Sequence, residues 1–370
     1  MTKSFQSLSA QMADTLREQL RAGTWGTTLP GERQLAKHFS VSRKTASKAI
    51  AMLRAEGVIR TSRGKSSALV TEKIPPRNTK APDRVVLLLP DPIDQSRPFM
   101  VYWLNNLTTL MHNVGVDFEL VIGWRYFGRN ADRSLQQLVD SHPAKCWILV
   151  RSPCSLQQWF ADNGVPAVVA GSPLDDIKLP SVDLDHRAIV RHAALTLLRE
   201  GHRRLAYVFE KARFGGTVIG EQAFRETIAD YDSSATPGIC RPSMNAASII
   251  NELRRIHNSS LRPTAYMMGN SFSYVTALSW FNSQQLLVPG DISLISHDED
   301  PFLPFLHPTP ARYAIGSAKF ANALYKAVRR VMDHGSGLDF KELIIPDYIK
   351  GASVGPPPSA SREAEIFRRR

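Results

Sequence analysis

The sequence has 370 residues, of which 43% are hydrophobic and 22% are charged, a balance that excludes a wholly disordered chain and favours two or more folded domains. The formal charge of +12 is concentrated at one end, because residues 1–80 hold 15 Lys and Arg but only 5 Asp and Glu. Such a focused positive field attracts a polyanion, either nucleic acid or an anionic membrane surface.

The cysteines and the N-terminus point to a reducing compartment. Cys146, Cys154 and Cys240 form no CxxC pair and no cluster with the histidines, so neither a metal site nor a disulfide framework is predicted. The N-terminus lacks the pattern of a signal peptide, and the longest aliphatic run, Val85–Leu89, is far shorter than the roughly 20 residues that span a bilayer. We therefore expect a cytoplasmic protein without a membrane partner.

The basic N-terminal region has the pattern of three helices followed by a two-stranded wing. Apolar residues recur there at spacings of three and four, and Ser42 and Gly57 are good residues for the start and the end of a helix. The expected elements are a helix over residues 5–22, a short helix after Pro30, a helix from Ser42 to Gly57, and short strands at 58–59 and 68–70.

The rest of the chain alternates strand-like and helical stretches. The strand-like runs are 85–89, 118–122, 147–150, 167–170, 205–209, 265–268 and 292–296, with helical patterns near 99–114, 131–141, 155–163, 186–200, 217–230, 245–257 and 272–284. Such alternation predicts an α/β fold with parallel sheets, and its length favours two lobes with a cleft between them.

These patterns divide the chain into four predicted parts. They are a basic domain of three helices and a wing at 1–70, a proline-containing linker at 71–83, an α/β domain at 84–354 and a disordered tail at 355–370.

No enzyme signature occurs in the sequence. Gly64-Lys65-Ser66 is not a phosphate-binding loop, because Ile59 stands where that motif requires a glycine. The patterns GxGxxG, GxSxG and HExxH are also missing, so we predict no catalytic residue, no cofactor and no enzyme activity.

Residues 29–70, LPGERQLAKHFSVSRKTASKAIAMLRAEGVIRTSRGKSSALV, resemble the GntR-type winged helix-turn-helix signature. The resemblance implies that the helix beginning at Ser42 lies in the major groove of operator DNA. One departure is Ser66, which replaces the second glycine of the family's wing. The predicted DNA-binding residues are Arg33, Ser42, Arg43, Lys44, Thr45, Lys48, Arg63, Gly64 and Lys65.

Residues 181–210 and 288–303 resemble the LacI/GalR-type effector domain, through Val182 to Asp185, Gly201 to Ala206 and the run VPGDISLISHDEDPFL. That family has the two-lobed fold of periplasmic sugar-binding proteins and binds a small effector in the cleft. A GntR-type head on such a body is the architecture of the arabinose repressor group.

The resemblance also indicates candidate ligand residues. Asp298 and Asn270 match polar positions of the family, whereas Ser271 replaces the family's aspartate and Gly220 stands where its arginine is expected. Arg213 and Arg151 are the guanidinium groups that could serve instead, Arg151 because it follows a strand whose carboxyl end should face the cleft.

The sequence thus predicts a sequence-specific DNA-binding transcription regulator, a repressor, that acts as a homodimer and responds to a small effector, a carbohydrate. Two alternatives stay open: a non-sugar effector such as a purine or a phosphorylated metabolite, and a GntR-headed regulator with a pyridoxal-phosphate aminotransferase-like domain. Asp185 and His202 are interpreted as structural, and Trp147 and Tyr102 as either sugar-stacking or core residues.

Overall fold

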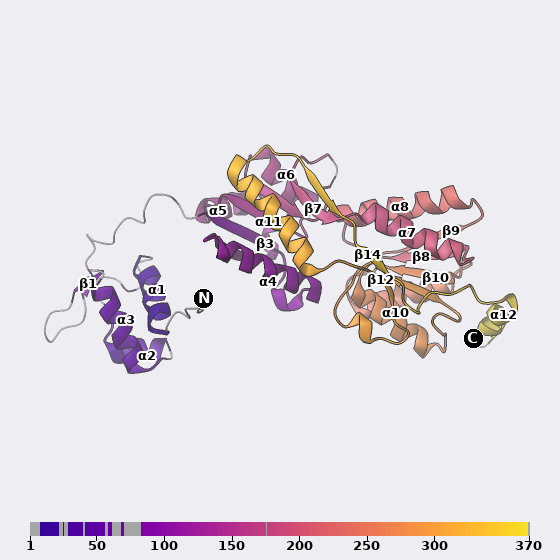
Figure 1. Ribbon diagram of the computed structural model, residues 1–370, viewed down its shortest axis with the longest axis horizontal. Coiled ribbons are helices and arrows are strands. Elements are labelled where there is room, and N and C mark those ends of the chain that lie inside the picture. Colours follow the sequence, from indigo (N-terminus) through magenta and orange to yellow (C-terminus); the bar gives the residue numbers. More distant parts are fainter. Residues whose placement is uncertain are drawn as a thin grey trace. The chain divides into compact units, whose positions relative to one another are not determined.

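The computed structural model describes residues 8–21, 25, 29–39, 41–55, 58–60, 68–69, 83–174 and 176–368. The chain divides into two compact units, residues 1–81 and 82–370, which we call the head and the body (Figure 1). The predicted wing residues Arg63, Gly64 and Lys65 lie outside the described residues.

The head is built from helices and a short antiparallel strand pair. Its described elements are α1 (Leu8–Arg21), α2 (Glu32–His38), α3 (Arg43–Ala55), β1 (Ile59–Arg60) and β2 (Ala68–Leu69). The apolar face that the sequence predicts for α1 is buried from Met12 to Leu20, whereas Leu8, at the first turn, is exposed. The buried side chains of α1 pack with those of α2 and α3, such as Leu35 and Ile50, in one small core.

Lobe 1 of the body is a six-stranded parallel sheet in the order β13-β7-β6-β5-β3-β4. Its strands are β3 (Arg84–Leu89), β4 (Asp117–Ile122), β5 (Cys146–Val150), β6 (Ala167–Ala170), β7 (Ser181–Leu184) and β13 (Lys341–Ile344). Its helices are α4 (Pro98–Asn113), α5 (Asp132–Ser141), α6 (Cys154–Asp162) and α11 (Ser317–His334).

Lobe 2 is a second six-stranded sheet, in the order β14-β12-β11-β10-β8-β9, parallel except for β14. Its strands are β8 (Arg204–Val208), β9 (Thr236–Cys240), β10 (Ala265–Met268), β11 (Ser293–Ser296), β12 (Ala311–Ala314) and β14 (Asp347–Ile349). Its helices are α7 (His186–Arg199), α8 (Gly215–Tyr231), α9 (Ala246–His257) and α10 (Ser271–Ser283).

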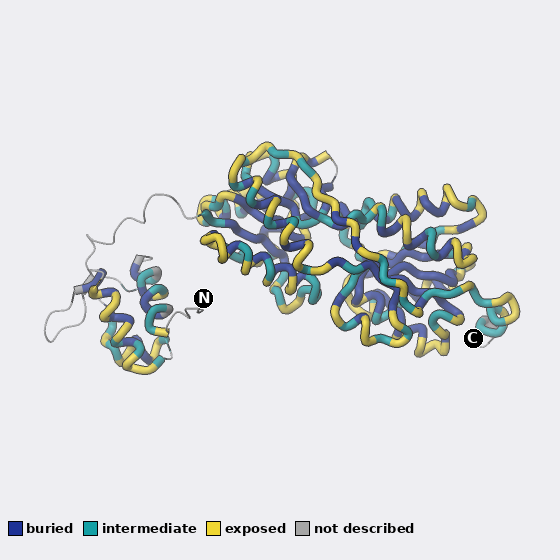
Figure 2. The backbone as a smooth tube through the Cα atoms, in the orientation of Figure 1, coloured by how far each residue is buried: buried dark blue, intermediate teal, exposed yellow. Residues whose placement is uncertain are grey.

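The alternation of side chains along the strands explains why both sheets carry helices on two faces. In β3, Val85 and Leu87 pack with α4 and α11, whereas Val86 and Leu88 pack with α5 and α6. The same division in lobe 2 places α7 and α8 on one face and α9 and α10 on the other. Figure 2 shows the buried strands between helices whose outer sides are exposed. The predicted two-lobed α/β fold is confirmed.

The chain passes between the lobes three times, after β7, after β12 and between β13 and β14. Sequence patterns did not predict β7, β9, β12, α11, β13 and β14, most of which lie in the last third of the chain. These strands have only three to five residues. Periodicity over so few residues is weak, so tertiary pairing decides them.

The C-terminal tail is ordered in its described part, and the prediction of a disordered tail is wrong there. Residues Ala360–Arg368 form α12. Arg362 donates from Nε and Nη2 to the two carboxylate oxygens of Asp291, at 2.8 and 2.9 Å, and Arg204 forms an ion pair with Glu363. Asp291 is only 2% exposed. A charge this buried needs a partner, and the basic tail supplies it.

His202 links the tail to the body and is fully buried. Its Nδ1 lies 2.8 Å from Thr264 Oγ1, and its Nε2 lies 2.9 Å from the carbonyl oxygen of Gly355. These contacts agree with the structural role expected for His202. Burial lowers the pKa of His202 from 6.5 to about 4. The folded state therefore favours the neutral ring, whereas the unfolded chain takes up a proton below pH 6.5.

We predict that the body loses stability as the pH falls from about 6.5 to 4, and that His202 contributes up to about 3 kcal/mol of this loss. His202→Gln should flatten the dependence in this window, while His334→Gln, at an exposed helix end, should leave it unchanged. Urea unfolding of each variant at several pH values measures the slope. Equal slopes for His202→Gln and the parent would contradict the assignment.

Candidate functional site

The N-terminal end of α3 is the exposed basic part of the described head. Arg43 is 70% exposed, and Lys44 and Lys48 are also exposed. Ser42 Oγ accepts a hydrogen bond from the backbone N–H of Thr45 at 3.1 Å and therefore caps the helix, as the sequence predicts. Cationic side chains at an exposed helix end can reach base edges and phosphates of a DNA groove.

Glu32 holds α2 against α3 in the arrangement that presents this end. Its Oε1 accepts from Ser47 Oγ at 3.1 Å, and its Oε2 lies 3.6 Å from Arg43 Nε. Arg33, the next residue along α2, is exposed. The contact with Glu32 leaves 70% of the Arg43 side chain exposed, as contact with a polyanion requires.

The body contains a cavity of about 470 Å³ where the carboxyl ends of the two parallel sheets face each other. We call it the interlobe cavity. The residues at strand ends that line it are Leu89, Val150, Ala170, Leu184, Phe209, Gly269 and His297. Its charged and ionisable lining residues are Asp91, Arg97, Arg151, Asp183, His186, Glu210, His297 and Asp298.

Polar contacts join the lobes around this cavity. Arg97, just before α4 in lobe 1, forms an ion pair with Asp298, which follows β11 in lobe 2. Arg151 donates from Nη2 and Nη1 to Glu210 at 2.7 and 3.2 Å, and its guanidinium lies over the Phe214 ring. Each pair has one member on each lobe, so the charges link lobe 1 to lobe 2.

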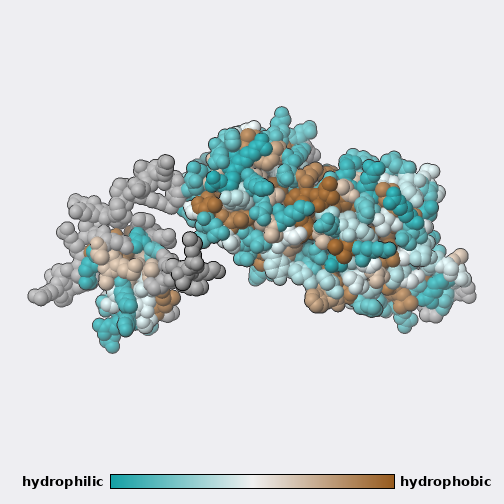
Figure 3. Space-filling model, viewed as in Figure 1, coloured by the Kyte–Doolittle hydropathy of each residue, from teal (hydrophilic) through white to brown (hydrophobic). Residues whose placement is uncertain are grey.

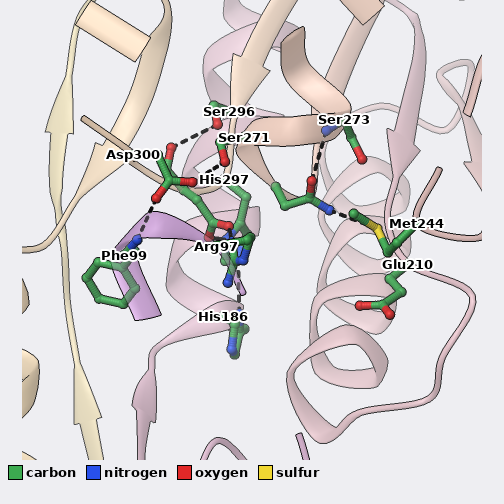
Figure 4. A network of polar contacts seen from close by, with 12 residues as sticks. Arg97, Phe99, His186, Glu210, Met244, Ser271, Ser273, Ser296, His297 and Asp300 are labelled. Atoms are coloured by element: carbon green, nitrogen blue, oxygen red, sulfur yellow. Dashed lines mark hydrogen bonds and ion pairs between the residues drawn. The ribbon is translucent and has the colours of Figure 1, made fainter. Parts of the chain in front are cut away.

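Asp300 makes a third interlobe contact, and its carboxylate is fully buried. It accepts from the backbone N–H of Phe99 in α4 at 2.8 Å and from the hydroxyl of Ser271 at the start of α10 (Figure 4). An anion at these two helix N-termini is favoured by the free N–H groups and by the helix dipoles. Asp300 is not among the residues that line the cavity, so it contributes to the link between the lobes.

A chain of hydrogen bonds runs along the cavity wall from Asp183 to Asp298. Asp183 Oδ2 lies 3.0 Å from His186 Nε2, and His297 Nδ1 lies 3.0 Å from Asp298 Oδ1. Between them, His186 Nδ1 lies 3.0 Å from His297 Nε2 (Figure 4). For all three contacts to be hydrogen bonds, the two rings must share three protons and carry one positive charge.

The pKa directions place that charge on His186. Burial disfavours it, but the charge of Asp183 and the hydrogen bond to it outweigh burial and raise the pKa of His186. Burial and the neighbouring charges of His186 and Arg97 lower the pKa of His297 well below its ordinary value. Despite burial, the charge and hydrogen bond of His186 lower the pKa of Asp183.

The sequence-predicted ligand residues do not all lie at the cavity. Asp298, Asn270 and Arg151 line it, although the Asn270 side chain also caps α10 by accepting from Ser273 N at 2.9 Å. Arg213 is exposed and does not line the cavity, because Phe214 and the start of α8 form the wall at this loop.

Neither residue considered for sugar stacking faces the cavity. Trp147 is buried in the core of lobe 1, and Tyr102 is 49% exposed on α4. Asp185, the other residue read as structural, caps α7 by accepting from the backbone N–H of Ala188 at 2.9 Å.

Sequence reasoning missed Arg97, Asp183, His186 and His297. Asp183 lies within β7, His186 is the second residue after that strand, and His297 directly follows β11. The rule that ligands bind at the carboxyl ends of parallel strands could therefore have indicated all three. Arg97 lies eight residues beyond β3 and had no such signal.

Comparison with protein families and curated proteins agrees with this architecture. Residues 8–69 match the bacterial regulatory proteins of the gntR family, and residues 194–354 match the periplasmic binding protein-like domain. The HTH-type transcriptional regulator AglR of Rhizobium meliloti (strain 1021) is 24% identical over 206 residues, 53% of this chain and 57% of AglR. The probable HTH-type transcriptional regulator EndR of Paenibacillus polymyxa is 22% identical over 182 residues, 46% of this chain and 53% of EndR. The chain spans little more than half the length of these curated relatives.

Solved structures resemble the chain in fold. A LacI family transcriptional regulator from Bifidobacterium animalis subsp. lactis DSM 10140 has a TM-score of 0.64 at 16% identity, over 74% of this chain and 98% of that one. The transcriptional regulator CelR in complex with cellobiose has a TM-score of 0.64 at 16% identity, over 88% and 100%. A LacI family transcriptional regulator from Enterococcus faecium with bound ribose has a TM-score of 0.60 at 13% identity, over 74% and 99%.

The chain therefore combines a head that matches the gntR family model with a body that matches the periplasmic binding protein-like domain and has the fold of solved LacI-type regulators. Both curated relatives are HTH-type transcriptional regulators. In the described part of the chain, no set of three or more acidic, His or Cys side chains is arranged to hold a metal ion, and no helix is long and apolar enough to cross a membrane.

We predict that Asp300→Ala widens the separation of the two lobes, because it leaves Phe99 N–H without its acceptor. Charge-assisted hydrogen bonds contribute about 1.5–3 kcal/mol each. Nitroxide labels at Gln137→Cys on α5 and Asn251→Cys on α9, in a Cys154→Ser background, allow pulsed electron resonance to measure the distance distribution.

The matched control is Asp333→Ala, which removes an exposed carboxylate of α11. It should retain the parent distribution, whereas Asp300→Ala should give longer or broader distances. A folded Asp300→Ala variant with the parent distribution would show that Asp300 does not hold the lobes together.

Proposed function

We propose that the chain is a sequence-specific transcription regulator, a repressor, that binds operator DNA through the head and is controlled by a neutral sugar in the interlobe cavity. The observation that carries this proposal is that one chain combines an exposed basic helix end at Arg43 with a 470 Å³ cavity between two lobes. A cavity of this size accommodates a small metabolite.

The charges of the cavity favour a neutral effector over a phosphorylated one. Four carboxylates, two guanidinium groups and the positively charged His186 ring line it, and each positive group is paired with a carboxylate: Arg97 with Asp298, Arg151 with Glu210 and His186 with Asp183. A phosphate would face an excess of negative charge. Hydroxyl groups, by contrast, can donate to a carboxylate and accept from a guanidinium.

Aromatic rings complete a site suited to a sugar. Trp103, Phe214 and Phe272 line the cavity, and such rings pack against the apolar C–H faces of a pyranose. The complexes of the fold neighbours with cellobiose and with ribose agree with this choice. No lysine is among the described residues that line the cavity, which disfavours a pyridoxal-phosphate Schiff base there.

Regulation follows from the links between the lobes. The chain crosses between the lobes three times, so the lobes form one linked body. A sugar that contacts both lobes favours the lobe arrangement to which it binds more tightly. It can shift operator affinity only by its differential affinity for the two arrangements, typically about 1–3 kcal/mol.

We also propose that two copies of the chain bind one operator, as two-fold DNA sites require two heads. The exposed apolar side chains Leu343 and Ile345, on β13 and the crossover after it, support a second copy as the partner. Figure 3 shows hydrophobic residues gathered over this part of the body. Sedimentation of the full chain as a monomer at operator-binding concentrations would contradict a stable dimer.

For the head, we predict that Arg43→Ala reduces discrimination between operator and unrelated DNA by about 1–3 kcal/mol, since it removes a base contact. Arg54→Ala removes the same charge at the opposite, exposed end of α3 and should preserve discrimination. Fluorescence anisotropy with both DNA duplexes at one salt concentration measures the difference. Equal behaviour of the two variants would show that α3 does not read the operator through this end.

For the cavity, we predict that Asp298→Ala abolishes the response to the sugar while operator binding without the sugar is retained. The variant removes an acceptor of hydroxyl groups, and DNA contact belongs to the head. A thermal-shift screen of neutral sugars identifies the effector, and anisotropy then compares operator affinity with and without it.

Asp94→Ala is the matched control, because Asp94 is an exposed carboxylate that does not line the cavity. A full response in Asp298→Ala would place the effector elsewhere. Loss of operator binding without the sugar would instead show that Asp298 supports the fold or the dimer.

A further inference from the structure

The position at which the LacI/GalR resemblance expects an arginine is closed in this structure. Gly220 is buried within α8, and a Cβ atom placed on it would lie 3.1 Å from Tyr207 Oη and 3.4 Å from Val190 Cγ2. Gly220 is also not among the residues that line the interlobe cavity. The cavity therefore lacks a guanidinium from α8.

Arg97 brings a guanidinium into the same cavity from the opposite lobe. Its backbone is extended, with φ −67° and ψ 146°, and its carbonyl oxygen accepts from Met100 N at 2.9 Å, which fixes the residue at the start of α4. Its side chain is 34% exposed, lines the cavity and forms the ion pair with Asp298 (Figure 4).

We propose that Arg97 is the effector-binding guanidinium of this chain, supplied by lobe 1 in place of the arginine absent at Gly220, and that Arg97 and Asp298 together bind two neighbouring hydroxyl groups of a sugar. This inference rests on the proposed function, because it assigns a residue and a chemical group to the same cavity. It makes a vicinal diol the part of the effector that contacts both lobes.

The contacts of the two arginines distinguish their roles. Arg151 uses two N–H groups on Glu210 and lies over the Phe214 ring, with 4.9 Å from its Cζ to the ring centroid. Arg97 makes one ion pair, through Nη1, and no other hydrogen bond of its guanidinium is formed with the described residues. A guanidinium has five N–H donors, so Arg97 retains donors for ligand oxygens.

The partner of Arg97 is held in the orientation that such binding needs. Asp298 Oδ1 lies 3.0 Å from His297 Nδ1, and the backbone oxygen of Asp298 accepts from Ser296 Oγ at 2.8 Å. His297 in turn is fixed by His186. One hydroxyl can donate to the carboxylate while its neighbour accepts from the guanidinium, which is the pattern of a diol.

The test measures sugar affinity by isothermal titration for the parent and for Arg97→Gln, Arg97→Lys and Arg84→Gln. The probes are D-ribose, D-glucose, D-galactose and cellobiose, with glucose 6-phosphate and adenine as the anionic and purine alternatives. Arg84 is the matched control, because it pairs with Asp117 and does not line the cavity.

We expect a neutral sugar to bind the parent. Arg97→Gln should raise the Kd for that sugar by about 10- to 100-fold, because the variant loses a charge-assisted hydrogen bond. Arg97→Lys keeps the charge but not the planar guanidinium, so its Kd should lie between those of the parent and Arg97→Gln. Arg84→Gln should retain the parent Kd.

Deoxy analogues of the bound sugar distinguish direct contact from a structural effect. Removal of the hydroxyl that Arg97 contacts should weaken binding to the parent but hardly change binding to Arg97→Gln. If Arg97→Gln does not fold, as judged by circular dichroism, the same cycle is measured with Arg97→Lys.

Three outcomes would overturn the inference. If Arg97→Gln binds the sugar with the parent affinity while Asp298→Ala loses affinity for it, Arg97 does not contact the sugar, and the proposed function still holds. If removal of a hydroxyl weakens binding equally in the parent and in Arg97→Gln, Arg97 does not contact that hydroxyl and acts only on the fold. Binding of glucose 6-phosphate or adenine, without any of the neutral sugars, contradicts the sugar effector and this inference together.

Discussion

The carboxyl ends of two parallel sheets face each other in the body, and the rest of the proposed site depends on this constraint. Residues at or just after the ends of these strands line the cavity, so Asp183 of lobe 1 and His297 of lobe 2, which are distant in sequence, are linked there through His186. Three passages of the chain between the lobes keep these edges opposed. The cavity is therefore a property of the topology, and its chemistry is a property of the few residues at strand ends.

Opposite charges across the cavity make its shape depend on both lobes at once. Arg97 with Asp298, Arg151 with Glu210, and Asp300 with the start of α4 each connect lobe 1 to lobe 2. The two ion pairs have partly exposed arginine side chains, so they add little net stability because solvent screening and desolvation oppose the attraction. They suit a molecule that must exchange contacts within the protein for contacts with a ligand at small net free energy.

Sequence reasoning captured the features that local pattern encodes. The helix cap at Ser42 and the buried α3 positions such as Ile50 follow from residue type and from spacings of three and four, and the continuous aliphatic run at 85–89 forms the buried strand β3. What it missed depends on distant partners: α12 is ordered by Asp291, and Arg97 meets Asp298 only because α4 and β11 come together across the lobes. Arg213 failed as a cavity residue because nearness in sequence to a cavity loop does not set the direction of a side chain.

We propose that one coupling free energy links the interlobe cavity to operator binding. The most direct test measures the affinity of the full chain for its sugar with and without saturating operator, at one salt concentration, and compares the ratio with the change that the sugar causes in operator affinity. Linkage requires the two factors to be equal, and we expect about 5- to 150-fold. A sugar that binds equally well to free and operator-bound protein would contradict the account.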